Sequence, residues 1–387
     1  MSVFLTDATW HLTLSAVRSL GSKNIEVIAG DVKRQFFFRS RYCQQYICCP
    51  HPKNELFVNF LYDAVKGVKS DVLIPMSNNT IISISRNKTL FEDITTVPIP
   101  DLRTVMKAYD KHQTMRYAIK LDIPSPRTYF IDNDSDLNNI AQNVDYPLII
   151  KPRMSEGASA GVLRANSSNE LITMYKTVKS IFGSVIIQEY IPGGSMQMRM
   201  VNALYNKDSE PIAMFTAKKH REYPITGGVT TFGESIWDPR IAELGERLLD
   251  AWKWYGVAEI EFKVDPRDNT PKLIEVNPRF WTYLQLPIYC GVDFPYLLYK
   301  IALDENVSPV ERYKTGIKYV HPFKDPLTML KILCKSRSRK TFYDLLSSYR
   351  GEKTYAIFSW KDPVPMIGKI ISALGDNKPN RYRSSDK

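Results

Sequence analysis

The chain has 387 residues, of which 44% are hydrophobic and 24% are charged, and its formal net charge is +11. This length and balance predict a globular protein of two or three domains, and no apolar run approaches the 18 residues of a transmembrane helix. Residues 311–387 contain 17 Lys and Arg against 7 Asp and Glu, which leaves about +1 for the rest. The main fold is therefore not expected to bind nucleic acid. The five cysteines show neither zinc nor redox spacing, so we expect reduced thiols and a cytoplasmic protein.

Residues 1–105 show strand and helix patterns in alternation. Strands are expected at 3–5, 25–29, 46–49 and 71–75, with helices at 12–20 and 56–65. Short connections between alternating elements predict a parallel α/β sheet, and the absence of GxGxxG gives no support for a dinucleotide site. The loops 7–10 and 76–79 follow strands, where α/β folds bind ligands, although ordinary turns have the same composition.

Two lysines and a loop of small residues follow. A helix is expected over 106–121 with Lys111 near its start, and the apolar strand 147–152 carries Lys151 near its end. A buried lysine is costly unless an anion meets it, whereas a lysine that reaches the surface is the ordinary alternative. The loop 152–161 is rich in Gly, Ala and Ser, which suits a flap over phosphates but is equally common in simple hairpins.

Polar side chains alternate with apolar ones in two late strands joined by the turn 265–271. An antiparallel hairpin centred on Asp268 would place Glu261 opposite Glu275, and like charges so placed cost roughly 0.2–1 kcal/mol. Period-two alternation gives the polar face the following residues: Glu259, Glu261, Lys263, Leu273, Glu275 and Asn277. Within this face the two carboxylates of Glu261 and Glu275 and the amide oxygen of Asn277 are all oxygen ligands. They predict a hard cation such as Mg²⁺ held together with phosphates, and an exposed hairpin face is the alternative.

The order of these motifs resembles the ATP-grasp superfamily, and more closely its predicted ATP-dependent carboligase, or carboxylate–amine ligase, branch. The resemblance rests on 188–194, 215–219 and 274–281, and extends from Val3 to about Leu303. It implies an α/β protein with an α+β catalytic part: an ATP-grasp fold preceded by a Rossmann-like domain. The expected domains are 1–105, 106–305 (subdomains 106–190 and 191–305) and a basic helical segment, 306–387.

The resemblance also implies roles for individual residues with ATP and Mg²⁺ (or Mn²⁺) as cofactors. Those expected to bind ATP are Lys111, Lys151, Ser155, Gly157, Ala158, Ser159, Gln188, Glu189, Tyr190 and Ile191. Those expected to hold the metal are Glu261, Glu275 and Asn277. Arg279 would stabilise a carboxylate or acyl phosphate, and Lys219 would reach the γ-phosphate side. Many relatives bind the ribose through an acidic residue after the hinge, whereas this chain offers Ser195 or Gln197 there.

The resulting functional hypothesis is amide formation between a small-molecule carboxylate and an amine through an acyl phosphate. The Gly-punctuated segment 221–233 is expected to line the substrate side. A carboxylase or kinase-like phosphotransferase, or an ATP-binding sensor without turnover, is the alternative. Apolar spacing near 327–333 and 366–374 predicts amphipathic helices in the basic segment. Packing on the core is the favoured interpretation for them, and contact with an anionic membrane is the other.

Overall fold

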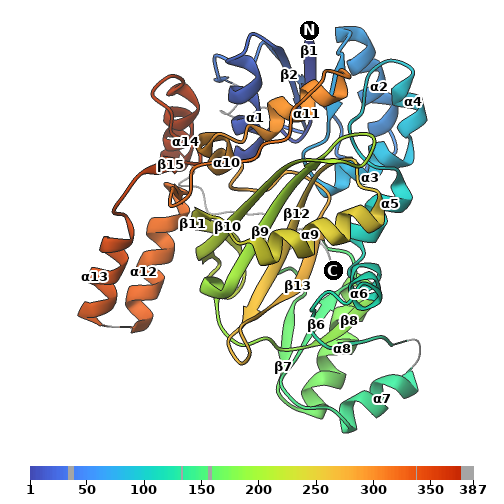
Figure 1. Cartoon of the computed structure of the whole chain (residues 1–387), viewed down its shortest axis with the longest axis vertical. Helices are drawn as coiled ribbons and strands as arrows, with labels where there is room; N and C mark the ends of the chain where they lie inside the picture. Colours follow the sequence, from blue (N-terminus) through green and yellow to red (C-terminus); the bar gives the residue numbers. More distant parts are fainter. Residues whose placement is uncertain (34–38, 132–133, 156–158, 337, 376–387) are drawn as a thin grey trace.

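The computed structural model describes residues 1–33, 39–131, 134–155, 159–336 and 338–375. These residues form three β-sheets with helices packed around them (Figure 1).

The N-terminal sheet is parallel, with the order β3-β2-β1-β4, and this confirms the predicted α/β class. Its strands are β1 (Ser2–Leu5), β2 (Glu26–Asp31), β3 (Gln45–Cys48) and β4 (Val72–Ile74). Its helices are α1 (His11–Gly21), α2 (Phe57–Val68), α3 (Asn78–Arg86) and α4 (Lys88–Glu92). The loops after β1 and β4 lie at the carboxyl ends of the strands, which is where open parallel sheets bind ligands.

The single helix predicted over 106–121 is wrong, because two helices meet at Asp110. These are α5 (Leu102–Tyr109) and α6 (Lys111–Lys120). The backbone of Asp110 is extended and its carboxylate accepts a hydrogen bond from the His112 amide, so it caps α6. An N-cap inside an apolar-periodic stretch ends one helix and starts the next, and here it makes Lys111 the first residue of α6.

A small antiparallel sheet follows, with the order β5-β8-β6-β7. Its strands are β5 (Thr128–Tyr129), β6 (Leu148–Pro152), β7 (Leu163–Ala165) and β8 (Val185–Glu189). Helices α7 (Asp134–Gln142) and α8 (Ser168–Phe182) pack on one face, where Leu171, Tyr175 and Val178 of α8 join a buried core. This sheet forms a separate lobe at the bottom of Figure 1.

The large sheet has seven strands in the order β13-β12-β9-β10-β11-β14-β15. Its first five strands in chain order are β9 (Met198–Tyr205), β10 (Pro211–Tyr223), β11 (Val229–Ile236), β12 (Gly256–Asp265) and β13 (Thr270–Asn277). The two short strands are β14 (Lys318–Val320) and β15 (Lys353–Tyr355). Helix α9 (Pro239–Trp252) covers one face, and a short 3₁₀ turn (Ser195–Gln197) precedes β9.

The β12–β13 hairpin has the predicted register at the acidic pairs. Glu261 lies opposite Glu275, and Glu259 lies opposite Asn277. The prediction that Leu273 shares their face is wrong, because Leu273 pairs with Phe262 and Ile274 is an extra residue between the two pairs. One extra residue reverses the alternation, so Leu273 is buried in the core beneath α9 while Ile274 lines the cavity described below.

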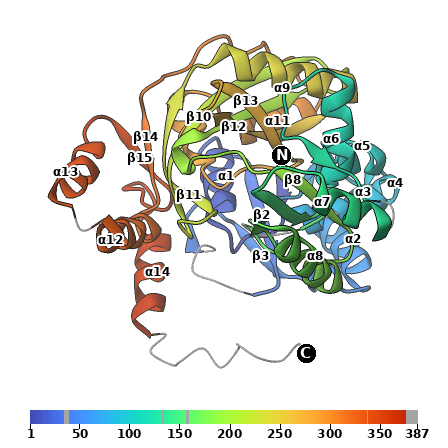
Figure 2. The ribbon, with the colours of Figure 1, turned by 90° about the horizontal axis from the view of Figure 1, so that it is seen from below.

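Late parts of the chain return to the N-terminal sheet. Helices α10 (Gln285–Cys290) and α11 (Phe294–Ala302) pack near α1, and Trp281 and Phe294 share one buried core with Val3 and Leu12. Three further helices, α12 (Lys324–Ser336), α13 (Arg339–Ser348) and α14 (Val364–Gly375), lie at one side of the molecule in both ribbon views (Figures 1 and 2). No helix in the described part of the chain is long and apolar enough to span a bilayer.

Candidate active site

A cavity of about 820 Å³ lies between the small sheet and the large sheet. Its walls come from β6 and β8 on one side and from β10, β12 and β13 on the other, with the loop 225–230 at its edge. Trp10 and Asn78, from the two N-terminal loops singled out by sequence, also line it. The volume falls within the roughly 300–1,000 Å³ typical of sites for small molecules and cofactors.

Two lysines from the small-sheet side face the cavity. Lys151, at the end of β6, is only 7% exposed, and Lys111, at the start of α6, is 8% exposed. The Asp110 carboxylate pairs with the Arg153 guanidinium, and the Lys111 amide donates to the Arg153 carbonyl at 3.0 Å. These contacts fix the start of α6 beside the end of β6. Burial lowers the pKa of Lys151 to about 8, although the nearby Glu275 opposes the shift.

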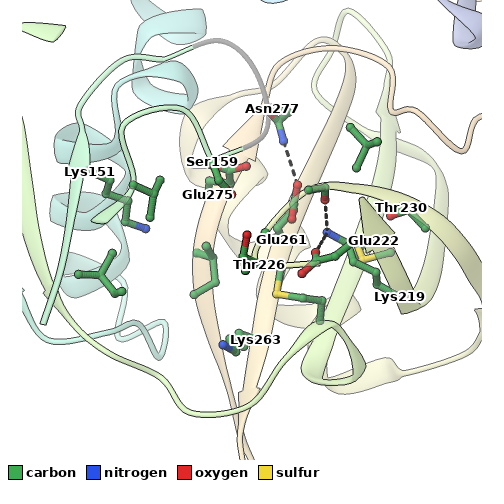
Figure 3. Close-up of a pocket in the computed structure, with 18 of the residues that line it drawn as sticks. Lys151, Ser159, Lys219, Glu222, Thr226, Thr230, Glu261, Lys263, Glu275 and Asn277 are labelled. Atoms are coloured by element: carbon green, nitrogen blue, oxygen red, sulfur yellow. Dashed lines mark hydrogen bonds and ion pairs between the residues drawn. The ribbon is translucent and has the colours of Figure 1, made fainter. Parts of the chain in front are cut away.

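The hairpin presents the carboxylates of Glu261 and Glu275 to the cavity, with Lys151 on the other side (Figure 3). The Lys111 ammonium lies 3.6 Å from a carboxylate oxygen of Glu275. Burial would raise the pKa of Glu275, but Lys111 and Lys151 outweigh it and the net pKa is lowered. Burial raises the pKa of Glu261 to about 8, although Lys219 opposes the shift. A cation bound beside Glu261 would favour its charged form and oppose this shift.

The amide of Asn277 lies between charged neighbours. Its nitrogen donates to Glu259 at 3.2 Å and to Glu261 at 3.4 Å, while its oxygen accepts from Arg279 at 3.2 Å. In this arrangement the nitrogen, not the oxygen, faces the carboxylates. A turn of the amide plane would exchange the two atoms and give a cation a third oxygen.

Oxygen donors are the only candidate metal ligands that converge here. The described residues contain no group of three or more His, Cys, Asp or Glu side chains arranged to hold a metal. The candidate set is therefore two carboxylates and one amide, which fits Mg²⁺ better than zinc because Mg²⁺ takes few protein ligands and completes its shell with phosphate and water.

Two further positively charged side chains, Lys219 and Arg279, line the cavity. The ammonium of Lys219 is 3.3 Å from a carboxylate oxygen of Glu222 and donates to the Gly228 carbonyl at 3.2 Å. Burial would lower the pKa of Lys219, but Glu261 and Glu222 outweigh it and the net pKa is raised. Arg279 also lines the cavity, with its guanidinium 3.9 Å from Glu259.

The loop of small residues reaches the far side of the cavity. Ser155 accepts a hydrogen bond from the Lys111 ammonium at 3.4 Å, and Ser159 lines the cavity near Gly227. A Cβ atom on Gly227 would lie 2.3 Å from the Ser159 hydroxyl, so the loop and the 225–230 segment touch where Gly227 has no side chain. Gly157 and Ala158 lie outside the described residues.

The segment 188–191 lines the cavity at the end of β8. The Glu189 and Tyr190 amides already donate to the carbonyls of Arg127 and Pro147, at 2.9 and 3.2 Å. The Gln188 side chain is buried, and its nitrogen donates to Thr128 at 2.8 Å while its oxygen has no hydrogen-bond partner. Buried acceptors are rarely left unpaired, and this one lies at the end of β8 beside the cavity.

The two residues expected near a ribose are engaged with the protein itself. Ser195 donates to the His220 carbonyl at 2.8 Å, and the Gln197 oxygen accepts from the Gly194 amide at 3.0 Å. Neither Ser195 nor Gln197 is among the residues that line the cavity.

Apart from the ribose candidates Ser195 and Gln197, all predicted site residues within the described part of the chain line this one cavity. Sequence reasoning did not assign Glu222, Glu259 or Lys263, which also line it. Glu259 and Lys263 follow the same period-two alternation as Glu261, so the signal for both was present. Glu222 had no local signal beyond its place in the polar segment 221–233, which was expected to line the substrate side.

The part of the chain that builds the cavity is similar to proteins of known family. Residues 108–283 match the model of the family described as ATP-grasp domain. This chain contains an ATP-grasp domain. The domain spans the small sheet and the first five strands of the large sheet, and it carries nearly every residue of the cavity. Trp10, Asn78 and Lys335 line the cavity from outside it.

Among curated relatives, a D-alanine–D-alanine ligase of Wolbachia pipientis (strain wPip) is 28% identical over 48% of this chain and 61% of its own length. A D-aspartate ligase of Enterococcus faecium is 23% identical over 59% of this chain and 58% of its own. The match thus spans about three fifths of these relatives. Among solved structures, a biotin carboxylase of Campylobacter jejuni has a TM-score of 0.68 at 16% identity, covering 82% of this chain and 74% of that one. This likeness concerns the fold alone.

Proposed function

We propose that the protein is an ATP- and Mg²⁺-dependent ligase that joins a carboxylate to an amine. The observation that carries the proposal is the meeting of Lys111 and Lys151 with Glu261 and Glu275 across one cavity. Two ammonium groups can neutralise a polyphosphate, and two carboxylates can hold the cation that accompanies it.

In the proposed complex, Lys111 and Lys151 contact the phosphates, and the loop carrying Ser155 and Ser159 covers them. The segment 188–191 lies against the adenine, where the 6-amino group would supply the donor that the Gln188 oxygen lacks. Glu261, Glu275 and the amide oxygen of Asn277 would hold Mg²⁺ (or Mn²⁺), which when bound neutralises charge on the phosphoryl oxygens.

The chemistry is two displacements. A carboxylate oxygen attacks the γ-phosphorus of ATP, the bond to the β-phosphate oxygen breaks, and ADP leaves with that electron pair. An amine nitrogen then attacks the acyl carbon of the resulting acyl phosphate. Inorganic phosphate leaves, the nitrogen gives up a proton and the amide remains. Lys219 and Arg279 are placed to stabilise the negative charge that develops on the transferred phosphoryl group and on the carboxylate.

The substrate class to test first is amino acids. The two curated relatives are named for ligation of D-alanine and D-aspartate, so phosphate release should be screened with D- and L-amino acids in pairs, and the products analysed by mass spectrometry. ADP formation together with an amide supports the ligase. ADP formation that depends on bicarbonate and yields no amide would instead indicate a carboxylase, and nucleotide binding without turnover would indicate a sensor.

Glu275→Gln tests the site itself. It removes one of the three proposed metal ligands and the partner of Lys111, so ATP turnover should fall at least on the order of a hundredfold while the thermal midpoint changes little. Glu243→Gln is the matched control, because Glu243 is exposed on α9. Normal turnover in Glu275→Gln would reject the assignment.

A further inference from the structure

The C-terminal helices expose an unusual number of large apolar side chains. On α12 and α13 these include Leu330 (59% exposed) and Tyr343 (68%). Trp360, just before α14, is 86% exposed, and α14 continues with the following exposed residues: Val364, Ile367, Ile370 and Ile371. Positions 364, 367 and 371 share one face of a helix. Such a face requires a partner, because each of these side chains is in water.

The charge around these side chains is basic. Exposed cations accompany the apolar residues: Lys331 and Lys335 on α12, Arg339 and Lys340 on α13, and Lys361 just before α14. Of these, Lys331 contacts Tyr223 of β10 and Lys335 also lines the cavity. Two acids of the same region, Asp325 and Asp362, are buried instead, where they pair with Arg221 and Arg18 of the body. Asp344 of α13 and Glu352 are exposed acids of the same region, so the exposed charge around the apolar side chains is mixed but mainly positive.

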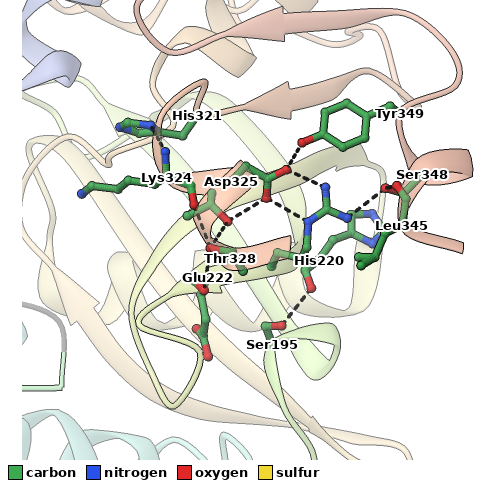
Figure 4. A network of polar contacts seen from close by, with 12 residues as sticks. Ser195, His220, Glu222, His321, Lys324, Asp325, Thr328, Leu345, Ser348 and Tyr349 are labelled. Carbon is green, nitrogen blue, oxygen red and sulfur yellow. Dashed lines mark hydrogen bonds and ion pairs between the residues drawn. The ribbon is translucent and has the colours of Figure 1, made fainter. Parts of the chain in front are cut away.

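These helices are fastened to the body and are not a free tail. The Asp325 carboxylate of α12 accepts two hydrogen bonds from the Arg221 guanidinium, at 2.8 and 2.7 Å, one from Thr231 at 3.0 Å and one from Tyr349 (Figure 4). Arg18 donates to the Asp362 carboxylate at 2.8 Å and to its carbonyl at 2.7 Å. The first contact holds α12 and the second holds the start of α14, so the exposed face has a fixed place on the molecule.

We propose that the exposed face of α12, α13 and α14 docks on an anionic membrane surface. Aliphatic side chains with a tryptophan and interspersed lysines are what an interfacial helix needs: the apolar groups enter the acyl boundary and the cations meet phosphate headgroups. A second copy is disfavoured as the occupant, because a symmetric contact would bring two faces of the same charge together. The docking does not depend on the proposed ligase activity.

Co-sedimentation of the full chain with vesicles tests the proposal. Binding is expected to phosphatidylcholine vesicles that contain phosphatidylserine and not to phosphatidylcholine alone, and it should weaken as salt is raised. Ile367→Asn with Ile371→Asn should reduce the affinity by about tenfold or more, since two buried isoleucines are lost from the lipid. Ile119→Asn is the matched control, because Ile119 is 55% exposed on α6 and Ile371 is 56% exposed.

Tryptophan fluorescence gives a second measurement. Anionic vesicles should shift the emission to the blue, and Trp360→Phe should remove most of that shift while the other tryptophans remain. Failure of the full chain to bind anionic vesicles would overturn the proposal, as would equal loss of binding in Ile119→Asn. Self-association in sedimentation velocity that the double α14 variant abolishes would also overturn it, because the face would then be covered by a second copy.

Discussion

Asp325→Asn is the substitution whose consequence follows most directly from the structure. The carboxylate is fully buried and receives four donors, two of them from the Arg221 guanidinium. Asparagine has nearly the same shape but no charge, and one of its two terminal atoms is itself a donor. The substitution therefore leaves Arg221, which is 5% exposed, with a buried charge and no counter-ion.

Breaking a buried ion pair from one side costs about 3–5 kcal/mol. For a chain of 387 residues we expect the thermal midpoint to fall by about 4–6 °C if the network unfolds with the whole protein. If α12 and α13 detach alone, the loss appears first as proteolysis within 324–350. Differential scanning calorimetry and limited proteolysis distinguish the two cases.

Asp344→Asn removes the same charge from an exposed position on α13 and should change stability by less than about 0.5 kcal/mol. The double variant Arg221→Met with Asp325→Leu should be more stable than Asp325→Asn, because no charge is then left unpaired. If Asp325→Asn and Asp344→Asn prove equally stable, the network does not hold these helices and the reasoning fails.

Two further predictions concern nucleotide selection and pH. Gln188→Leu removes the unpaired oxygen and should weaken ATP binding about tenfold while GTP binding, which gains nothing from that acceptor, changes little; equal losses for both nucleotides in isothermal titration would contradict the role of Gln188. Burial lowers the pKa of His321 to about 2 and, with Lys324, that of His11 to about 4, so the unfolded chain takes up protons first as pH falls. Stability should therefore be complete above about pH 6.5 and decline below it, by up to about 1.4 kcal/mol per pH unit for each histidine. His321→Gln should flatten this slope in chemical denaturation, His51→Gln should not, and an unchanged slope in both would argue against the buried pair.

The hairpin shows how much of the site a sequence can specify. Alternation and a turn-rich centre were enough to place Glu261 opposite Glu275, because side-chain direction in a strand depends only on parity and register. The same rule misplaced Leu273, since the extra residue Ile274 has no distinctive composition. The position of a bulge depends on what the strand packs against, here the core under α9. The local sequence pattern contains no information about that packing.

The break between α5 and α6 was readable in principle. Asp101 and Asp110 both cap helices, and Asp is a favoured N-cap residue. Because the apolar periodicity continues through 106–121, the cap at Asp110 was not recognised. The position of Lys111 at the buried start of α6 was therefore not predicted either. The contact that fixes it, Asp110 with Arg153, joins positions 43 apart and gives no local signal.

The arrangement of the C-terminal helices is the part of the structure that the sequence predicts least well. Arg221 and Asp325 are separated by 104 positions, and the local sequence around either residue does not predict the contact. Composition correctly indicated amphipathic helices but favoured packing them on the core. The structure instead buries Asp325 and Asp362 against the body and leaves much of the apolar surface of these helices exposed, as at Trp360 and Ile371.

The connection between α12 and the cavity gives the two proposals a common test. Arg221 and Glu222 are consecutive on β10: Arg221 holds Asp325 of α12, while Glu222 lines the cavity and pairs with Lys219. The Thr328 hydroxyl of α12 also donates to the Glu222 carbonyl at 3.4 Å. If docking of α12 on lipid shifts this strand, nucleotide affinity changes, and by linkage the nucleotide must then change lipid affinity by the same factor. If β10 does not move when α12 docks, the affinity for nucleotide and the affinity for lipid are independent. Measuring the nucleotide affinity with and without anionic vesicles distinguishes the two cases.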